Sequence, residues 1–252
     1  LLCLPSTVQA EPVSLHLLGR SQVGQYHLDP SVRETQWLTS KKKLVLGTSA
    51  PDYAPFDIST GSDFYEGISA DYAGLLSQLL KIELSVYRYT SRAEAITALK
   101  TGEIDLLATA NAFEQQEPEL MFSTTYAVDT PLLITRIDRP KASASTALRL
   151  AMLDHYQPPD RVRKVYPEAE LQLYESTLGA LSAVTFGQAD AYLGDVISTH
   201  NLINKNYLNT VYLKELARLE TQGFGFAVHE DNPLLLKLIN ASLALIPPSE
   251  SN

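Results

Sequence analysis

The second half of this chain repeats a pattern of the first half at a constant offset of 85 residues. The matched residues are Tyr89, Ser91, Ala95, Ala98, Gly102 and Asp105 in the first copy, and Tyr174, Ser176, Ala180, Ala183, Gly187 and Asp190 in the second. These six identities fall within 17 positions, where ordinary residue usage would give about one. The repeat predicts two lobes of similar build, one for each copy.

Apolar spacing around the first copy predicts alternating strands and helices. Ser91 and Glu94 form a capping-box pattern that begins a helix, and Gly102 ends it. The expected elements are a strand at 44–46, a helix at 68–82, a strand at 84–89, a helix between Ser91 and Gly102, and a strand at 104–108. This alternation predicts an α/β fold with mostly parallel sheets, which bind ligands beyond the carboxyl ends of their strands.

The C-terminal stretch has no counterpart in the second copy. A strand is expected at 224–228 and a helix at 232–246, with Pro233 in its first turn. We expect this piece to return to the first lobe, so that the chain crosses between the lobes twice, as a hinge requires. The expected domains are a signal-peptide remnant at 1–10, a leader strand and helix at 11–39, lobe 1 at 40–124 plus 225–247, lobe 2 at 125–224, and a linker to a next domain at 248–252.

Composition argues against several classes of function. The 252 residues are 45% hydrophobic with a formal net charge of −9, which fits a well-cored globular protein and disfavours nucleic acid as a partner. The single cysteine, Cys3, supports neither a disulfide framework nor a cysteine-based zinc site. The histidines never pair at metal-ligand spacing, and no nucleophile elbow, phosphate loop or dinucleotide fingerprint is present. We therefore expect no metal, no cofactor and no catalytic residue, and a non-catalytic domain rather than an enzyme.

The first ten residues, LLCLPSTVQA, look like the end of an apolar signal peptide. Val8 and Ala10 occupy the small-residue positions that signal peptidase reads, which predicts export. No other stretch approaches the roughly 18 uninterrupted apolar residues that a membrane-spanning helix needs.

Several segments resemble, in order, the pattern of family 3 periplasmic solute-binding proteins. They are LVLGTSAPDYAPFDI, YEGISADYAGLL, ALKTGEIDLLAT, MFSTTY, GQADAYLGD and FGFAVHEDNPLL, which together span about residues 40–246. More narrowly, the leader VSLHLLGRS, the helix containing Trp37 and Leu38, and the ending SLALIPPSE resemble a Venus flytrap domain of BvgS-type hybrid sensor histidine kinases.

The resemblance implies a class II clamshell with hinges near 124–126 and 222–224, at Thr125, Tyr126, Gln222 and Gly223. It implies an extracytoplasmic, small-molecule-sensing domain of a two-component sensor kinase, located in the periplasm as part of an inner-membrane protein and signalling by lobe opening and closing. The implied partners are an unidentified small-molecule ligand, if there is one, together with an adjacent flytrap domain and a kinase in the same chain; a homodimer is a further option. The alternative is a free-standing ABC-transporter binding protein for amino acids or related small polar solutes, and the second alternative is a clamshell enzyme of the dehydratase type.

In amino-acid-binding members, an aromatic ring stacks on the ligand, an arginine grips its carboxylate and an aspartate takes its ammonium, because burying either charge unpaired is costly. The resemblance places Tyr53 as the aromatic and Asp195 as the aspartate. A packed loop tyrosine and a helix N-cap are the respective alternatives.

The expected arginine is missing. None stands between Arg92 and Arg136, and Gln115 or Gln116 occupies its position. A glutamine cannot neutralise an anion, so free α-amino acids are disfavoured as ligands.

Four more residues are expected at the cleft. Thr109 and Asn111 follow a first-lobe strand at the family's cleft edge, with turn formation as the alternative. His155 and Tyr156 stand where many relatives offer backbone amides to a carboxylate, and His155 is either a pH-sensitive contact or a plain loop residue. The complete expected ligand-binding set is Tyr53, Thr109, Asn111, Gln116, His155, Tyr156 and Asp195.

Overall fold

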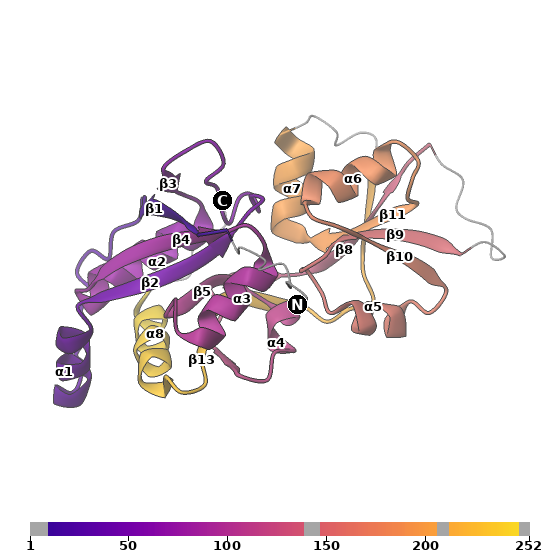
Figure 1. The fold of residues 1–252 in the computed structure, drawn as a ribbon. Helices are drawn as coiled ribbons and strands as arrows, with labels where there is room; N and C mark the ends of the chain where they lie inside the picture. The colour runs from indigo at the N-terminus through magenta and orange to yellow at the C-terminus, as the bar shows by residue number, and fades with distance from the viewer. Residues whose placement is uncertain (1–9, 139–146, 206–211, 247–252) are drawn as a thin grey trace, which may run out of the picture.

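The computed structural model describes residues 10–138, 147–205 and 212–246, which form two lobes (Figure 1). The expected linker and all of the expected signal-peptide remnant except Ala10 lie outside these described residues. Within the described ranges, no helix combines the length and the apolar character needed to cross a membrane.

Lobe 1 is a mixed sheet with helices on both faces. Its strand order is β3-β1-β4-β2-β5-β13-β6, with β7 paired to β13. The strands are β1 (Val13–Leu17), β2 (Lys43–Ser49), β3 (Phe64–Tyr65), β4 (Glu83–Tyr89), β5 (Leu106–Ala110), β6 (Leu120–Phe122), β7 (Ala127–Asp129) and β13 (Gln222–His229). Helices α2 (Ile68–Leu80) and α8 (Pro233–Leu245) pack on one face, and α3 (Arg92–Thr101) packs on the other. The C-terminal piece therefore returns to lobe 1, as Figure 1 shows for α8.

The leader extends this sheet. Strand β1 pairs antiparallel with β4 and parallel with β3. Helix α1 (Val32–Lys41) follows and begins with a complete capping box between Ser31 and Glu34. The leader thus belongs to lobe 1, where β1 lies between β3 and β4.

Lobe 2 is a five-stranded mixed sheet in the order β10-β9-β11-β8-β12. Its strands are β8 (Pro131–Arg136), β9 (Leu148–Leu153), β10 (Ala169–Tyr174), β11 (Ala191–Asp195) and β12 (Tyr212–Leu216). Helices α6 (Thr177–Thr185) and α7 (Val196–Lys205) pack on one face and α5 (Pro159–Val165) on the other. Both sheets are mixed rather than mostly parallel, because β13 and β8, which each follow a crossing between lobes, run antiparallel to β5 and β11.

The repeated serines begin equivalent helices in the two lobes. Ser91 and Ser176 cap α3 and α6 by accepting backbone N–H groups of the first turn. Only half of the expected capping box forms at α3, because the carboxylate of Glu94 accepts from Thr90 instead of the Ser91 N–H.

The repeated glycines and aspartates join each helix to its sheet. Gly102 and Gly187 have positive φ angles of 81° and 79° just after α3 and α6, which favours glycine there. Asp105 then accepts a backbone N–H of β2 at 2.8 Å, and Asp190 accepts a backbone N–H of β9 at 2.9 Å. The identities of the repeat thus maintain one helix-to-strand connection in both lobes.

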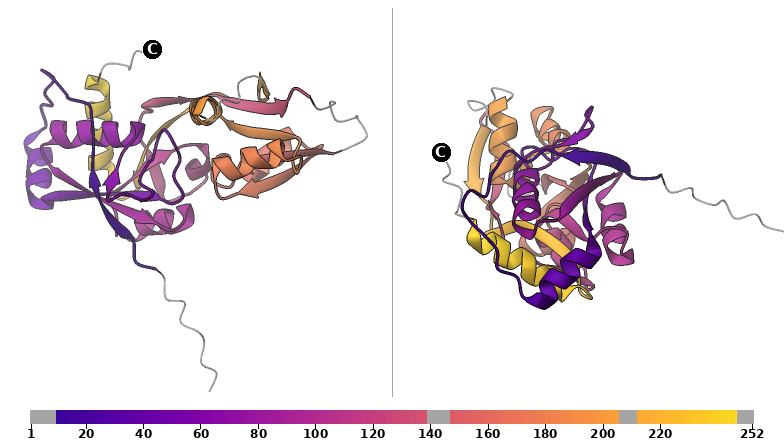
Figure 2. Two further views of the ribbon diagram at one scale, coloured as in Figure 1. Left: turned by 90° about the horizontal axis from the view of Figure 1, so that it is seen from above. Right: turned by 90° about the vertical axis from the view of Figure 1, so that its left-hand side faces the viewer.

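The two crossings between the lobes lie side by side. Strand β7 pairs antiparallel with the start of β13, so Thr125 and Tyr126 of one crossing lie near Gln222 and Gly223 of the other. A Cβ atom added at Gly223 would lie 2.5 Å from the Cβ of Thr125, which only glycine avoids. The left view of Figure 2 shows the two lobes side by side.

Candidate functional site

A small cavity lies where the two lobes meet. Its volume is about 10 Å³, room for about one water molecule. Its lining residues are Ser49, Pro51, Tyr53, Asp57, Arg92, Thr109, Asn111 and His155. All but His155 belong to lobe 1, so the candidate site is mainly the carboxyl-terminal edge of the lobe 1 sheet.

Tyr53, from the loop after β2, reaches across to lobe 2. It is 7% exposed and packs with Phe56 and Phe224 in the hydrophobic core of lobe 2, with ring centroids 5.5 and 6.1 Å from its own. Its hydroxyl donates a hydrogen bond to Oδ2 of Asp195. One loop of lobe 1 is therefore anchored in lobe 2 by both apolar packing and a buried polar contact.

Asp195 ends β11 and is completely buried. Its Oδ1 accepts the Ser198 N–H at 2.8 Å and so caps α7, while its Oδ2 accepts from the hydroxyls of Ser198 and Tyr53. Burial raises the pKa of Asp195, and the hydrogen bonds from Ser198 and Tyr53 oppose that rise. Burial and then the charge of Asp195 raise the pKa of Tyr53, so its hydroxyl stays protonated and donates.

A second buried carboxyl lies at the crossing. Asp129 is fully buried, accepts the hydroxyl of Tyr156 at 2.6 Å, and accepts the side-chain amide of Asn111 at 3.5 Å. Burial raises the pKa of Asp129 to about 7, and the nearby charge of Asp195 adds to the rise against the Tyr156 hydrogen bond. The Asn111 contact is a second polar link between lobe 1 and the residues leading into lobe 2.

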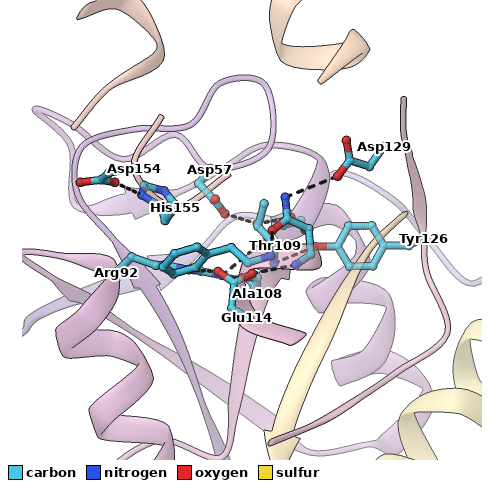
Figure 3. Close-up of polar contacts among 12 residues, drawn as sticks. Asp57, Arg92, Ala108, Thr109, Glu114, Tyr126, Asp129, Asp154 and His155 are labelled. Atoms are coloured by element: carbon cyan, nitrogen blue, oxygen red, sulfur yellow. Dashed lines mark hydrogen bonds and ion pairs between the residues drawn. The ribbon is translucent and has the colours of Figure 1, made fainter. Parts of the chain in front are cut away.

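Arg92 is the buried cation of the site (Figure 3). Its Nε donates to Oε1 of Glu114 at 2.7 Å, and its Nη2 donates to the carbonyl oxygens of Ala108 and Thr109 at 2.7 and 3.1 Å. Burial opposes the charge of Arg92, but Glu114 and Asp57 outweigh burial and raise its pKa. The guanidinium is therefore held charged at the floor of the cleft by carboxylates of its own lobe.

Thr109 links the polar groups of this floor. It has a φ of 57°, an uncommon conformation for a β-branched residue that is found mainly at functional sites. Its Oγ1 donates to Asp57 at 2.8 Å and lies 2.7 Å from the Ser69 hydroxyl, and its N–H donates to the Tyr126 hydroxyl at 3.0 Å. This hydrogen-bond network holds the strained backbone in place.

His155 covers the cavity from lobe 2. Its Nδ1 lies 2.7 Å from Oδ1 of Asp154, and its ring meets the rings of Tyr53 and Phe113 edge-on at 6.4 and 6.3 Å. Both of those rings come from lobe 1, so the histidine adds a third contact between the lobes.

The expected ligand-binding residues are only partly brought together. Those that line the cavity are Tyr53, Thr109, Asn111 and His155. Asp195 caps a helix, as its alternative had it, and also contacts Tyr53, while its expected role toward a ligand stays a prediction. Tyr156 is buried and donates to Asp129. Gln116 is exposed at the end of α4 (Ala112–Gln115) and is not among the lining residues.

Sequence reasoning missed four charged residues of the site, which are Asp57, Arg92, Glu114 and Asp129. One signal was available for Arg92, because it follows the capping serine of α3 whereas the repeat has Thr177 at that place. Glu114 stands three residues after Asn111, a capping-box spacing that the structure uses. Within the described ranges, no group of three or more histidine, cysteine, aspartate or glutamate side chains is arranged to hold a metal ion.

Two curated sensor proteins are similar to this chain over nearly all of its length. The virulence sensor protein BvgS of Bordetella pertussis is 37% identical over 238 residues, which cover 94% of this chain and 19% of the relative. The sensor protein EvgS of Escherichia coli K12 is 26% identical over 250 residues, which cover 95% of this chain and 21% of the relative. The chain thus spans about a fifth of the length of these relatives.

The fold and the sequence profile agree with these similarities. The crystal structure of the B. pertussis BvgS periplasmic domain matches with a TM-score of 0.78 and 36% identity, over 94% of this chain and 46% of that one. The expected two-lobed Venus flytrap fold is confirmed by this match. The profile of the bacterial extracellular solute-binding proteins, family 3, matches residues 44–251. The chain belongs to this family of solute-binding proteins.

Proposed function

We propose that this chain is an extracytoplasmic sensing domain of a longer, membrane-anchored sensor kinase, and that the posture of its two lobes is the signal. Its similarity to BvgS and EvgS, both named as sensor proteins, supports this assignment. Because the chain corresponds to 19% of BvgS and to 46% of the solved periplasmic domain, the proposal includes an adjacent flytrap domain and a kinase in the same polypeptide. The location is then the periplasmic side of the inner membrane.

The observation that carries the proposal is the direct contact between Tyr53 and Asp195. The lobes meet through side chains of the protein itself, and the cavity beside this contact has a volume of about 10 Å³. A ligand, where one exists, shifts the balance of open and closed states only by its difference in affinity for the two. The hydrogen bond from the Tyr53 hydroxyl favours the closed state even without a ligand. Such a bias suits a domain whose lobe arrangement is itself the signal.

The test removes this hydroxyl in the complete sensor protein that carries the chain. Tyr53→Phe deletes one donor while keeping the ring that packs on Phe56 and Phe224. We expect kinase autophosphorylation in membrane vesicles to change severalfold, since losing a hydrogen bond to a buried charged group costs about 1.5–3 kcal/mol. Tyr174→Phe is the matched control, because its hydroxyl bonds Gln172 within lobe 2.

Unchanged autophosphorylation in Tyr53→Phe, with lobes shown by X-ray scattering to have opened, would overturn the signalling proposal. A free-standing transport protein of the same family would behave in that way, because its lobe posture has no kinase to report to.

A further inference from the structure

The lobe 1 side of the cleft contains a buried arginine whose guanidinium is bonded to a carboxylate and to carbonyl oxygens of the same lobe. Arg92 is 6% exposed and lines the cavity. Its Nε and Nη2 donate to Glu114 and to two backbone carbonyls (Figure 3). Among the described residues Nη1 has no hydrogen-bond partner, so it is the nitrogen of the guanidinium left to donate to a solute.

Two carboxylates share this one cation. Glu114 is 1% exposed, and both of its oxygens are used, Oε1 by Arg92 and Oε2 by the Asn111 N–H at 2.8 Å. Asp57 is 6% exposed, lines the same cavity, and its charge also acts on Arg92. Burial raises the pKa of Asp57, against the hydrogen bonds from Tyr65 and Thr109 and the charge of Arg92. Glu114 alone already balances the charge of Arg92, so the floor of the cleft has no positive charge to spare.

We infer that Glu114 and Asp57 are specificity-determining residues that make this cleft refuse solutes bearing a carboxylate, so that its ligands are small polar solutes without one. The inference deepens the proposed function, since it takes the interlobe cleft as the solute site. A third carboxylate at Arg92 would be buried beside two others with a single positive charge between them, and burying an unpaired charge is very costly. Glu114 thus supplies, from inside the protein, the negative charge at Arg92 that a ligand carboxylate would otherwise bring.

A purely structural role for the ion pair makes a different prediction. If Glu114 only fixes α4 and Arg92, replacing it lowers stability and leaves the choice of solute unchanged. If Glu114 blocks carboxylates, replacing it creates carboxylate binding that the wild type lacks. The two roles are therefore separated by a gain of binding, which loss of stability cannot produce.

The experiment is isothermal titration calorimetry of the 252-residue chain with L-arginine and with agmatine, which differ by one carboxylate. We expect Glu114→Gln to bind L-arginine at least about tenfold more tightly than the wild type, a factor that corresponds to roughly 1.4 kcal/mol. Agmatine binding should show no such gain. Glu117→Gln is the matched control, because it removes a carboxylate from the partly exposed ion pair with Lys100, away from the cavity.

Asp57→Asn is a second variant that can be tested if Glu114→Gln does not fold, because it leaves the Arg92–Glu114 pair intact. A smaller gain for L-arginine in this variant is expected and would support the inference on its own. Wild-type protein that binds L-arginine more tightly than agmatine would overturn it, as would folded variants at both positions that gain no affinity for L-arginine. The titration measures solute binding and not kinase activity. A negative titration would therefore overturn this inference without affecting the signalling proposal, which the Tyr53→Phe experiment tests separately.

Discussion

Arg92 in lobe 1 and Thr177 in lobe 2 occupy the same position of the repeated pattern, directly after the serine that caps a helix. The backbone around them is equivalent, with the same cap, the same glycine turn and the same aspartate bonded to a neighbouring strand. Yet Arg92 is a buried cation at the cleft, and Thr177 is a half-buried residue at the start of α6.

The comparison shows that the repeat keeps the residues of the helix-to-strand connection and varies the residues that face the cleft. Identical residues hold the helix-to-strand connection in each lobe, whereas the charges that face the cleft differ. Lobe 1 supplies Arg92 together with Glu114 and Asp57, and lobe 2 supplies Asp195, which is satisfied by hydroxyl groups. Two lobes with the same backbone connection can therefore present differently charged surfaces to the cleft. The contact between these surfaces determines how the lobes close.

The largest expected effect comes from shortening the two equivalent side chains. Arg92→Ala should lower the free energy of unfolding by about 3–5 kcal/mol, because it leaves Glu114 buried without its cation. Thr177→Ala should change it by less than about 0.5 kcal/mol. Urea unfolding followed by circular dichroism measures both. Equal effects in the two lobes would remove the basis of the comparison.

A smaller effect is expected from pH. The pKa of Asp129 is raised from 3.8 to about 7, so the folded state favours its protonated form. This contribution to stability is present below about pH 3.8 and is lost as the pH rises through about 7. It amounts to roughly 2–4 kcal/mol at most.

Asp129→Asn provides the check, because an asparagine can still accept the Tyr156 hydroxyl without gaining a charge. Melting temperatures measured between pH 5 and pH 8 should fall less steeply in the variant than in the wild type. Parallel curves for the two proteins would show that Asp129 does not titrate in this window.

The smallest effect concerns the two aspartates of the repeat. Asp105→Ala and Asp190→Ala should each cost about 1–3 kcal/mol, because each leaves a strand N–H without its acceptor. The loss should be larger at Asp105, whose side chain is 10% exposed, than at Asp190, which is 26% exposed. Thermal unfolding ranks them, and the reverse order would mean that the two connections differ in more than burial.

Much of the fold could be predicted from the sequence, because its signals are local. Ser91 with Gly102 marks a helix, and apolar spacing marks the strands on either side. Tyr53 and Asp195 were each expected at the cleft, but their mutual contact was not, because it joins residues 142 positions apart and depends on how the lobes meet. Likewise, a single arginine at a helix start is usually exposed, and its burial here depends on Glu114, 22 positions away.

The most direct test of the account is small-angle X-ray scattering of the chain after unfolding, dialysis and refolding, which removes any carried ligand. If the protein's own side chains hold the lobes together, the wild type should scatter as the closed form, and Tyr53→Phe should have a larger radius of gyration. A ligand-free wild type that scatters as an open form, and closes only when a solute is added, would contradict the account.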